Sequence, residues 1–164
     1  MRQGADIPLS GPGPDDPGVR VPSPLIFAAA FALGLLLERL LPLPELPPGL
    51  RRALALPCLA ACAALGGWAF AWFLRLRTTV LPFRPSEALI TSGPYRFSRN
   101  PLYISTALLY IVLALWFAEL WTLLMLPAAM AVLQRLVIMK EEAYLERRFG
   151  QEYLDYKARV RRWL

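Results

Sequence analysis

Four long apolar runs constrain this chain more than any other feature. They cover Pro24–Leu43, Ala53–Leu74, Pro101–Ala118 and Leu120–Met139. At a helical rise of 1.5 Å per residue, roughly 20 residues reach about 30 Å, the thickness of the hydrocarbon core of a bilayer. Only 18% of the residues are charged, so there is too little polar sequence to cover these runs in water. The sequence predicts an all-α integral membrane protein with four transmembrane helices.

The connections between the runs predict two helical hairpins. A short proline-rich loop, Pro42–Arg52, joins the first two runs, and a tight turn at Ala118–Glu119 joins the last two. Small residues such as Gly34 and Gly67 let helix backbones approach closely, which favours packing inside a monomer over dimerisation. The expected organisation is a leader at 1–23, a first hairpin at 24–74, a loop at 75–100, a second hairpin at 101–139 and a tail at 140–164, with 24–164 forming one domain.

Basic residues predict the orientation of the helices. The loop and the tail share a surplus of them, whereas the Ala118–Glu119 turn has none. The loop holds Arg75, Arg77, Arg84, Arg96 and Arg99, and the tail holds Lys140, Arg147, Arg148, Lys157, Arg159, Arg161 and Arg162. By the positive-inside rule, both termini and the loop face the cytoplasm, and we expect a bacterial inner membrane. The net charge of +6 then reflects topology and anionic lipid rather than a nucleic-acid partner.

The two ends of the chain differ in character. Residues 1–23 are rich in proline and glycine and lack a signal-peptide pattern, so we expect a disordered leader. In the tail, aromatic and aliphatic residues recur every three or four positions between charges. This pattern predicts an amphipathic helix, broken at Gly150, that lies on the membrane or folds over the loop. A simple lipid anchor explains this apolar face of the helix equally well, but it does not explain the several tyrosines.

The segment before the third run carries the first candidate site residues. Asn100 and Pro101 predict a helix N-cap followed by a first-turn proline. Arg99 beside that N-terminus opposes the helix dipole, which indicates an anionic partner such as a carboxylate or phosphate. The alternative is that Arg99 only serves the positive-inside bias. Upstream, Gly93–Pro94 marks a turn, and Tyr95 follows as an aromatic that can stack on a planar ligand.

A second candidate group lies where the fourth run ends. Glu141 and Glu142 follow the apolar residues directly. On a continuous α-helix, Gln134 shares a face with Glu141, and Arg135 shares one with Glu142. An arginine inside a membrane helix suggests function. Its alternatives are an ion pair with the first run or snorkelling of the side chain to the interface.

Metal and disulfide chemistry have little support in the sequence. There is no histidine, which removes the commonest metal ligand and the usual catalytic base. Cys58 and Cys62 lie one turn apart in an apolar run, and no further ligand is near. We therefore expect two apolar thiols and no metal site.

Several short segments together resemble a known family. They are the stretch Thr91-Ser-Gly-Pro-Tyr-Arg-Phe-Ser-Arg-Asn-Pro-Leu-Tyr103, the Glu141-Glu142 pair, Leu145-Glu-Arg-Arg-Phe-Gly-Gln-Glu-Tyr153 and Val160-Arg-Arg-Trp-Leu164. Their order and spacing around a tight helical hairpin resemble the isoprenylcysteine carboxyl methyltransferases and the related phospholipid N-methyltransferases. The resemblance covers residues 77–164, over half the chain.

The resemblance implies S-adenosylmethionine as cofactor, in a pocket formed by the last two spans, the loop and the tail. By matching position, it implies catalytic roles for Arg99, Asn100 and Tyr103. The residues implied to bind the cofactor are Gly93, Pro94, Tyr95, Arg96, Arg99, Asn100, Pro101, Tyr103, Glu141, Glu142, Phe149 and Tyr153.

One departure from the family pattern affects the expected chemistry. Asn100 stands where many members carry a histidine, and an asparagine cannot titrate near neutral pH. Either the reaction needs no base, or a glutamate or tyrosine supplies it. A carboxylate or thiolate acceptor arrives deprotonated, whereas an amine must first lose a proton. The local excess of arginine fits an anionic acceptor, so an isoprenylcysteine-type carboxylate is favoured over a phospholipid amine or a thiol.

The implied activity is methyl transfer to a lipid-like or amphiphilic acceptor that enters laterally from the bilayer. The alternative is a non-catalytic membrane protein of the same fold that acts as a lipid- or partner-binding module, which the missing histidine supports. A transporter or channel is disfavoured, because few polar residues lie within the runs.

Overall fold

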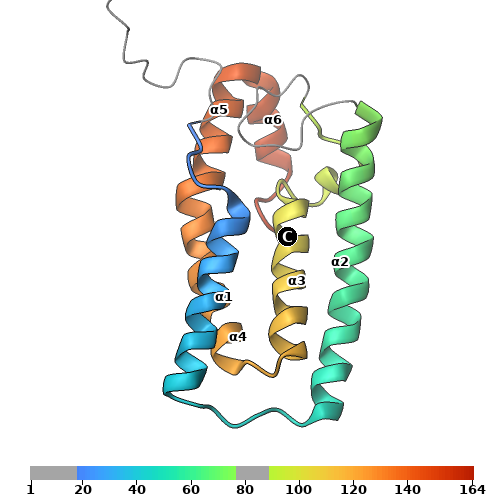
Figure 1. Cartoon of the computed structure of the whole chain (residues 1–164). Helices are drawn as coiled ribbons and strands as arrows, with labels where there is room; N and C mark the ends of the chain where they lie inside the picture. Colours follow the sequence, from blue (N-terminus) through green and yellow to red (C-terminus); the bar gives the residue numbers. More distant parts are fainter. Residues whose placement is uncertain (1–17, 77–88) are drawn as a thin grey trace, which may run out of the picture.

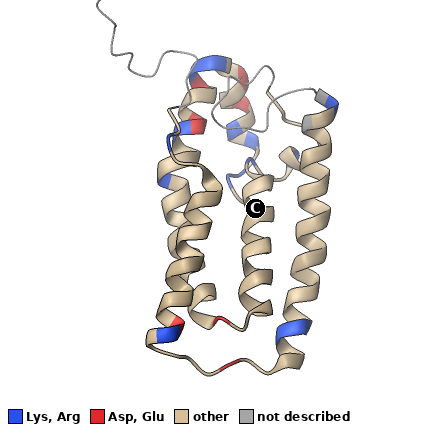
Figure 2. Cartoon of the chain, in the orientation of Figure 1, with Lys and Arg blue, Asp and Glu red and all other residues tan. Residues whose placement is uncertain are grey.

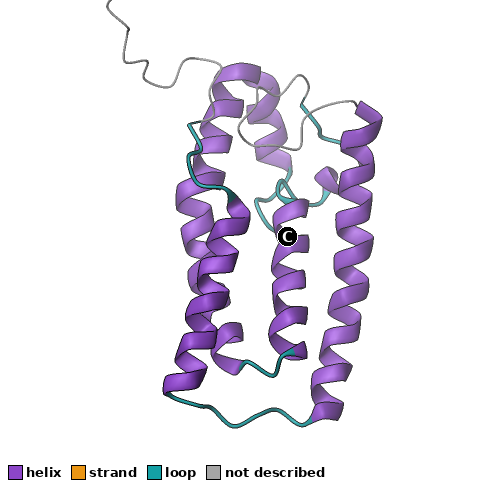
Figure 3. Cartoon of the chain, viewed as in Figure 1, coloured by secondary structure: helices purple, strands orange, loops and turns teal. Residues whose placement is uncertain are grey.

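The computed structural model of the chain describes residues 18–76 and 89–164. All regular secondary structure in these two ranges is helical (Figure 3). In chain order the elements are α1 (Ser23–Leu40), α2 (Pro48–Leu76), the 3₁₀ turn η1 (Gly93–Arg96), α3 (Pro101–Trp116), α4 (Leu120–Leu133), the π-helical turn η2 (Gln134–Ile138), α5 (Met139–Phe149) and α6 (Gln151–Arg159). Most of the predicted leader and the middle of the predicted loop lie outside the described residues.

Three helical segments are long and apolar enough to cross a bilayer. They are Ser23–Leu40, Pro48–Trp72 and Leu120–Phe149. The third predicted run forms α3, which is equally apolar but has only 16 residues. By length and composition, residues 18–76 and 89–164 therefore hold three candidate membrane spans and one shorter apolar helix.

The helices do not pack as the two self-contained hairpins that the sequence predicted. Along the bundle α1 packs on α4, and α2 packs on α3. The segment after α1 crosses the end of the bundle to reach α2, so these consecutive helices stand on opposite sides (Figure 1). Close approach occurs at Gly34, where a Cβ would overlap the backbone of Thr122, and at Gly66, where it would overlap Ser105 Oγ. The expectation for Gly67 was wrong, because a Cβ there meets no atom within 4 Å.

The fourth run does not end at Met139. Instead α4, η2 and α5 form one continuous helical path from Leu120 to Phe149. The π-helical turn places i→i+5 hydrogen bonds within this path, which adds a residue to the turn. The seven-residue spacing that would align Gln134 with Glu141 on an α-helix therefore does not hold. Sequence periodicity could not reveal this, because a π turn has no strong sequence signature.

An ion pair between Arg135 and the first helix is also absent from the described structure. The only acid on α1, Glu38, lies at the far end of the bundle. Its Oε1 accepts from Leu43 N at 2.7 Å, and its Oε2 accepts from Trp121 N at 3.1 Å. The second bond satisfies a free N–H in the first turn of α4, where the helix dipole favours an anion. Glu38 thus links α1 to the start of α4.

The tail folds back over the bundle at the end where Lys and Arg gather (Figure 2). The helix breaks at Gly150, which has φ +53°, so the predicted break there is confirmed. Beyond it α6 runs back beside α5 (Figure 1). Tyr156 on α6 donates a hydrogen bond of 2.7 Å to the carbonyl oxygen of Tyr95 in η1. This contact connects the tail to the segment preceding α3.

Candidate functional site

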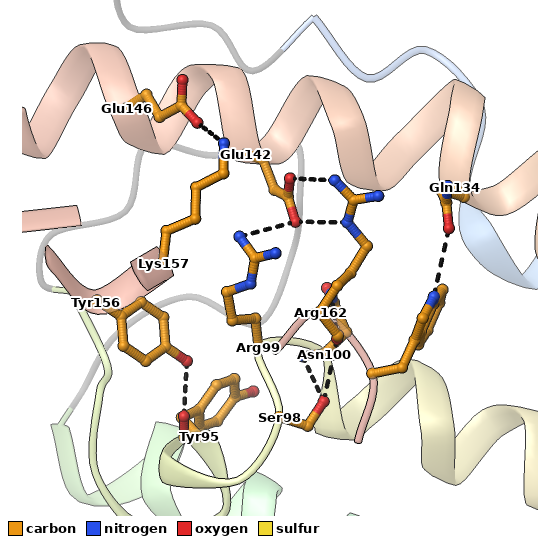
Figure 4. A network of polar contacts seen from close by, with 11 residues as sticks. Tyr95, Ser98, Arg99, Asn100, Gln134, Glu142, Glu146, Tyr156, Lys157 and Arg162 are labelled. Carbon is orange, nitrogen blue, oxygen red and sulfur yellow. Dashed lines mark hydrogen bonds and ion pairs between the residues drawn. The ribbon is translucent and has the colours of Figure 1, made fainter. Parts of the chain in front are cut away.

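The buried carboxylate of Glu142 is the centre of a charged network at this end of the bundle (Figure 4). Glu142 lies in the first turn of α5 and is only 6% exposed. Arg162 Nε donates to its Oε1 at 2.9 Å, and Arg162 Nη2 donates to its Oε2 at 2.7 Å. Arg99 Nη1 lies 3.3 Å from Oε1. Arg99, which precedes α3, and Arg162, which follows α6, therefore share the carboxylate of Glu142.

Arg99 keeps unused hydrogen-bonding capacity in this network. Its side chain is 10% exposed. Nε and Nη1 are buried and have no hydrogen-bond partner among the described residues, because the contact with Glu142 is close but not aligned as a hydrogen bond. A buried donor without an acceptor is costly in a folded protein. Arg99 therefore retains donors for one more acceptor, such as a carboxylate.

The other acid of the pair has a separate environment. Tyr103 on α3 donates its phenolic hydrogen to Glu141 Oε1 at 2.9 Å. This bond joins the start of α3 to the start of α5, across the gap between two helices. Glu141 and Glu142 thus point to different partners, one a neutral phenol and the other two guanidinium groups.

The backbone of Arg161 and Arg162 holds the start of α3 in place by hydrogen bonds. The carbonyl oxygen of Arg161 accepts from Arg99 N at 3.0 Å. The carbonyl oxygen of Arg162 accepts from Ser98 Oγ at 3.2 Å and from Asn100 Nδ2 at 3.0 Å. Asn100 does stand at the N-cap position, but its side chain makes no capping bond to α3. Its amide is used instead to hold the returning chain.

Three tyrosines complete the cluster around these charged groups. Tyr95, Tyr153 and Tyr156 are all buried, and the rings of Tyr153 and Tyr156 meet edge to face at 6.1 Å between centroids. Burial, together with the charge of Glu142, raises the pKa of Tyr153 to about 12. Burial likewise raises the pKa of Tyr95 and that of Tyr156. All three phenols are therefore neutral at physiological pH.

The structure brings most of the predicted site residues together, but not all. Seven of them contribute to this cluster: Tyr95, Arg99, Asn100, Tyr103, Glu141, Glu142 and Tyr153. Arg96 is exposed and lies over the ring of Phe97, 5.2 Å from its centroid. Phe149 is half-buried at the end of α5.

The remaining three predicted residues shape the backbone. Pro94 and Pro101 are buried within the first turns of η1 and α3. Gly93 has φ +62°, and a Cβ there would overlap the indole of Trp72 on α2. A side chain at position 93 would therefore push the η1 turn away from α2.

Sequence reasoning missed Arg162, Ser98 and the pairing of Trp163 with Gln134. Trp163 Nε1 donates to Gln134 Oε1 at 3.3 Å. The closing Arg-Arg-Trp-Leu stretch was a signal that these residues matter. Their roles depend on the chain returning to α3, however, and no local pattern predicts that return.

Comparisons with known proteins show the family of the chain. A profile of the family described as phospholipid methyltransferase matches residues 50–152. An uncharacterized protein from Haemophilus influenzae is 38% identical over 63 residues, which cover 38% of this chain and all of that protein. No solved structure matches the chain.

Proposed function

Since the chain belongs to the phospholipid methyltransferase family, we propose that it is a membrane methyltransferase that uses S-adenosylmethionine and modifies a lipid-like acceptor. One observation carries the proposal. The buried donors of Arg99 lack hydrogen-bond partners among the described residues and lie beside a pair of acids, at the end of an apolar helical bundle.

The residues of the cluster fit the chemical groups of this cofactor. The unpartnered Nε–H of Arg99 suits its carboxylate, because a hydrogen bond between two charged groups is stronger than one between neutral groups. Glu141, which accepts a hydrogen bond from Tyr103, suits an ammonium group or a ribose hydroxyl. The rings of Tyr95 and Tyr153 are buried, so they support the cluster rather than present a face to adenine. Both acids also favour a nearby positive charge.

When bound, S-adenosylmethionine supplies a methyl group already activated on a sulfonium, which passes to a nucleophile by in-line displacement. The protein then has to align the acceptor and exclude water. The helices α5 and α6 stand over the end of the bundle, and the chain after α6 runs back beside α3 (Figure 1). Arg162 holds Glu142 in place by two hydrogen bonds.

The surroundings of the site favour an acceptor that arrives deprotonated. The amide of Asn100 is occupied by Arg162, and Asn100 cannot take up a proton. The raised pKa values of Tyr95, Tyr153 and Tyr156 remove the phenols as bases. Glu141 is the remaining carboxylate, and its Oε1 already accepts the phenolic hydrogen of Tyr103, which makes it a poor base for an amine. We therefore propose a carboxylate or thiolate acceptor ahead of an amine.

The same proposal includes a topology. The four apolar helices cross the bilayer, with α3 as the shortest span, supported on either side by α2 and α4. The charged end that holds α5 and α6 faces the cytoplasm, consistent with its surplus of Lys and Arg (Figure 2). The cluster then lies on the cytoplasmic side, where S-adenosylmethionine is made.

Calorimetric titration of S-adenosylmethionine into the purified protein, in detergent and in lipid nanodiscs, tests the proposal. We expect saturable binding that Arg99→Gln and Glu141→Gln weaken at least tenfold. Arg96→Gln is the matched control, because Arg96 is exposed and stacks on Phe97 outside the cluster. Absence of binding at millimolar cofactor in both media would refute the proposal.

A second candidate function has one observation in its favour. Glu142 is already neutralised by two arginines of the same chain, as in a structural ion-pair network that needs no ligand. A non-catalytic lipid-binding module would use exposed cations of the tail, such as Arg147, Arg159 and Arg161. It predicts that Arg99→Ala leaves vesicle binding unchanged, and that removing the exposed charges of Arg159 and Arg161 abolishes it.

A further inference from the structure

A groove opens between α3 and α4, beside the charged cluster. Its volume is about 470 Å³, within the range of roughly 300–1,000 Å³ typical of ligand pockets. Ile104, Ala107 and Ile111 line it from α3, and Met130 and Ala131 line it from α4. Both helices are apolar, so this part of the groove offers hydrocarbon contacts and no hydrogen bonds from side chains.

The end of the groove near the start of α3 is polar. Gln134 and Arg135, in the π-helical turn, line it together with Trp163. Gln134 accepts a hydrogen bond from the Trp163 indole at 3.3 Å. Arg135 is exposed and has no ion-pair partner among the described residues. A π turn within a helix often marks a functional position, and an unpaired cation on a membrane helix is costly unless a ligand or the interface receives it.

The polar end also adjoins the proposed methyl-transfer site. Ile104 in the groove follows Tyr103, whose hydroxyl donates to Glu141. Trp163 in the groove follows Arg162, which binds Glu142. Gln134, at the polar end of the groove, lies in the same close-up as Arg162 and Asn100 (Figure 4). An amphiphile with its head at this end is therefore placed next to the cluster.

We propose that the α3–α4 groove binds the single hydrocarbon chain of the methyl acceptor, with Arg135 attracting the acceptor's anionic head. This inference rests on the proposed function and specifies the class of substrate. The groove's apolar walls suit one alkyl or prenyl chain. The free cation at its polar end selects an anionic head over a neutral one.

Photolabelling tests the inference in nanodiscs of neutral lipid. The probes are a 16-carbon fatty acid with a terminal diazirine and the corresponding neutral alcohol, and mass spectrometry locates the adducts. We expect the acid to label the apolar walls of the groove, around Ile111 and Met130. Adducts spread evenly over the outer faces of all helices would mean ordinary boundary lipid and overturn the proposal.

Two pairs of variants sharpen the test. Ala131→Phe fills the groove, whereas Val132→Phe adds the same ring at a neighbouring position that is 42% exposed and does not line it. We expect Ala131→Phe to reduce groove labelling at least fivefold and Val132→Phe to leave it unchanged. Arg135→Gln is expected to reduce labelling by the acid to that by the alcohol, and Arg135→Lys is expected to retain most of it. Equal labelling of Ala131→Phe and Val132→Phe would also overturn the proposal.

Cofactor titration separates this inference from the proposed function. Ala131→Phe should bind S-adenosylmethionine as the unaltered protein does, because position 131 lies outside the charged cluster. If the unaltered protein binds no cofactor, the proposed function fails, whatever the labelling shows. If it binds the cofactor but the acid does not label the groove, only the acceptor site is wrong.

Discussion

Arg162 donates hydrogen bonds to both carboxylate oxygens of Glu142, at 2.9 and 2.7 Å. Its own carbonyl oxygen accepts hydrogen bonds from Ser98 and Asn100. One residue near the end of the described chain therefore connects the start of α5 with the start of α3. A two-point arginine–carboxylate contact fixes orientation as well as distance. The position of Arg99 relative to Glu142 depends on these contacts of Arg162, because Arg99 and Glu142 come from segments that are far apart in sequence.

Replacing Arg162 should loosen the site and the fold together. Arg162→Gln leaves the buried Glu142 with only the poorly aligned Arg99, and we expect a loss of about 2 kcal/mol in the free energy of unfolding. Thermal unfolding in detergent measures it. The exposed neighbour Arg161 provides the control, since its link to Arg99 is through the backbone carbonyl. Equal losses of unfolding free energy in Arg162→Gln and Arg161→Gln would contradict a stabilising role for the contact between Arg162 and Glu142.

The role of Asn100 as a hydrogen-bond donor can be tested with two substitutions of different polarity. Asn100→Asp places a carboxylate against the carbonyl oxygen of Arg162, so acceptor faces acceptor. Asn100→Ala only removes a bond and leaves Ser98 as a donor to the same oxygen. We expect the aspartate variant to lower Tm further than the alanine variant. The reverse order would mean that Asn100 does not act by donating to Arg162.

Two glycines of the predicted small-residue faces should respond oppositely to alanine. Gly34→Ala forces a Cβ into the backbone of Thr122, and overpacking of this kind costs about 1–3 kcal/mol. Gly67→Ala meets no atom within 4 Å and removes a helix-interior glycine, which favours the folded state by roughly 0.5–1 kcal/mol. Thermal unfolding of both variants checks the prediction. A stabilised Gly34→Ala would show that α1 and α4 are not in this contact.

Alkaline pH should destabilise the site through Tyr153. Its pKa of about 12 exceeds the ordinary tyrosine value near 10, so the folded state binds the phenolic proton more tightly than the unfolded state does. The resulting stability is complete below pH 10 and decreases as the pH rises to about 12. We expect Tm to fall over this window, and to fall less in Tyr153→Phe. Identical pH profiles for the two proteins would exclude this contribution.

Much of the site could be predicted from the sequence, but the contacts within it could not. The Arg99–Tyr103 segment and the Glu141–Glu142 pair stood out because charges beside apolar runs are uncommon and demand partners. The sequence suggested that Arg99 needs an anion, but not that Glu142 provides it. Arg96 and Arg99 were equal candidates in the sequence, yet Arg96 is exposed and lies over the ring of Phe97, outside the cluster.

The sequence by itself determined that this chain is helical and suited to a membrane, since apolar runs of this length have few other ways to satisfy their backbone hydrogen bonds. The charged end of the bundle also followed from sequence. The tertiary structure decided which helices pair, that η2 interrupts the α-helical register, and that the chain returns so that Arg162 reaches Glu142. These are long-range contacts, which depend on shape complementarity between segments rather than on any local pattern.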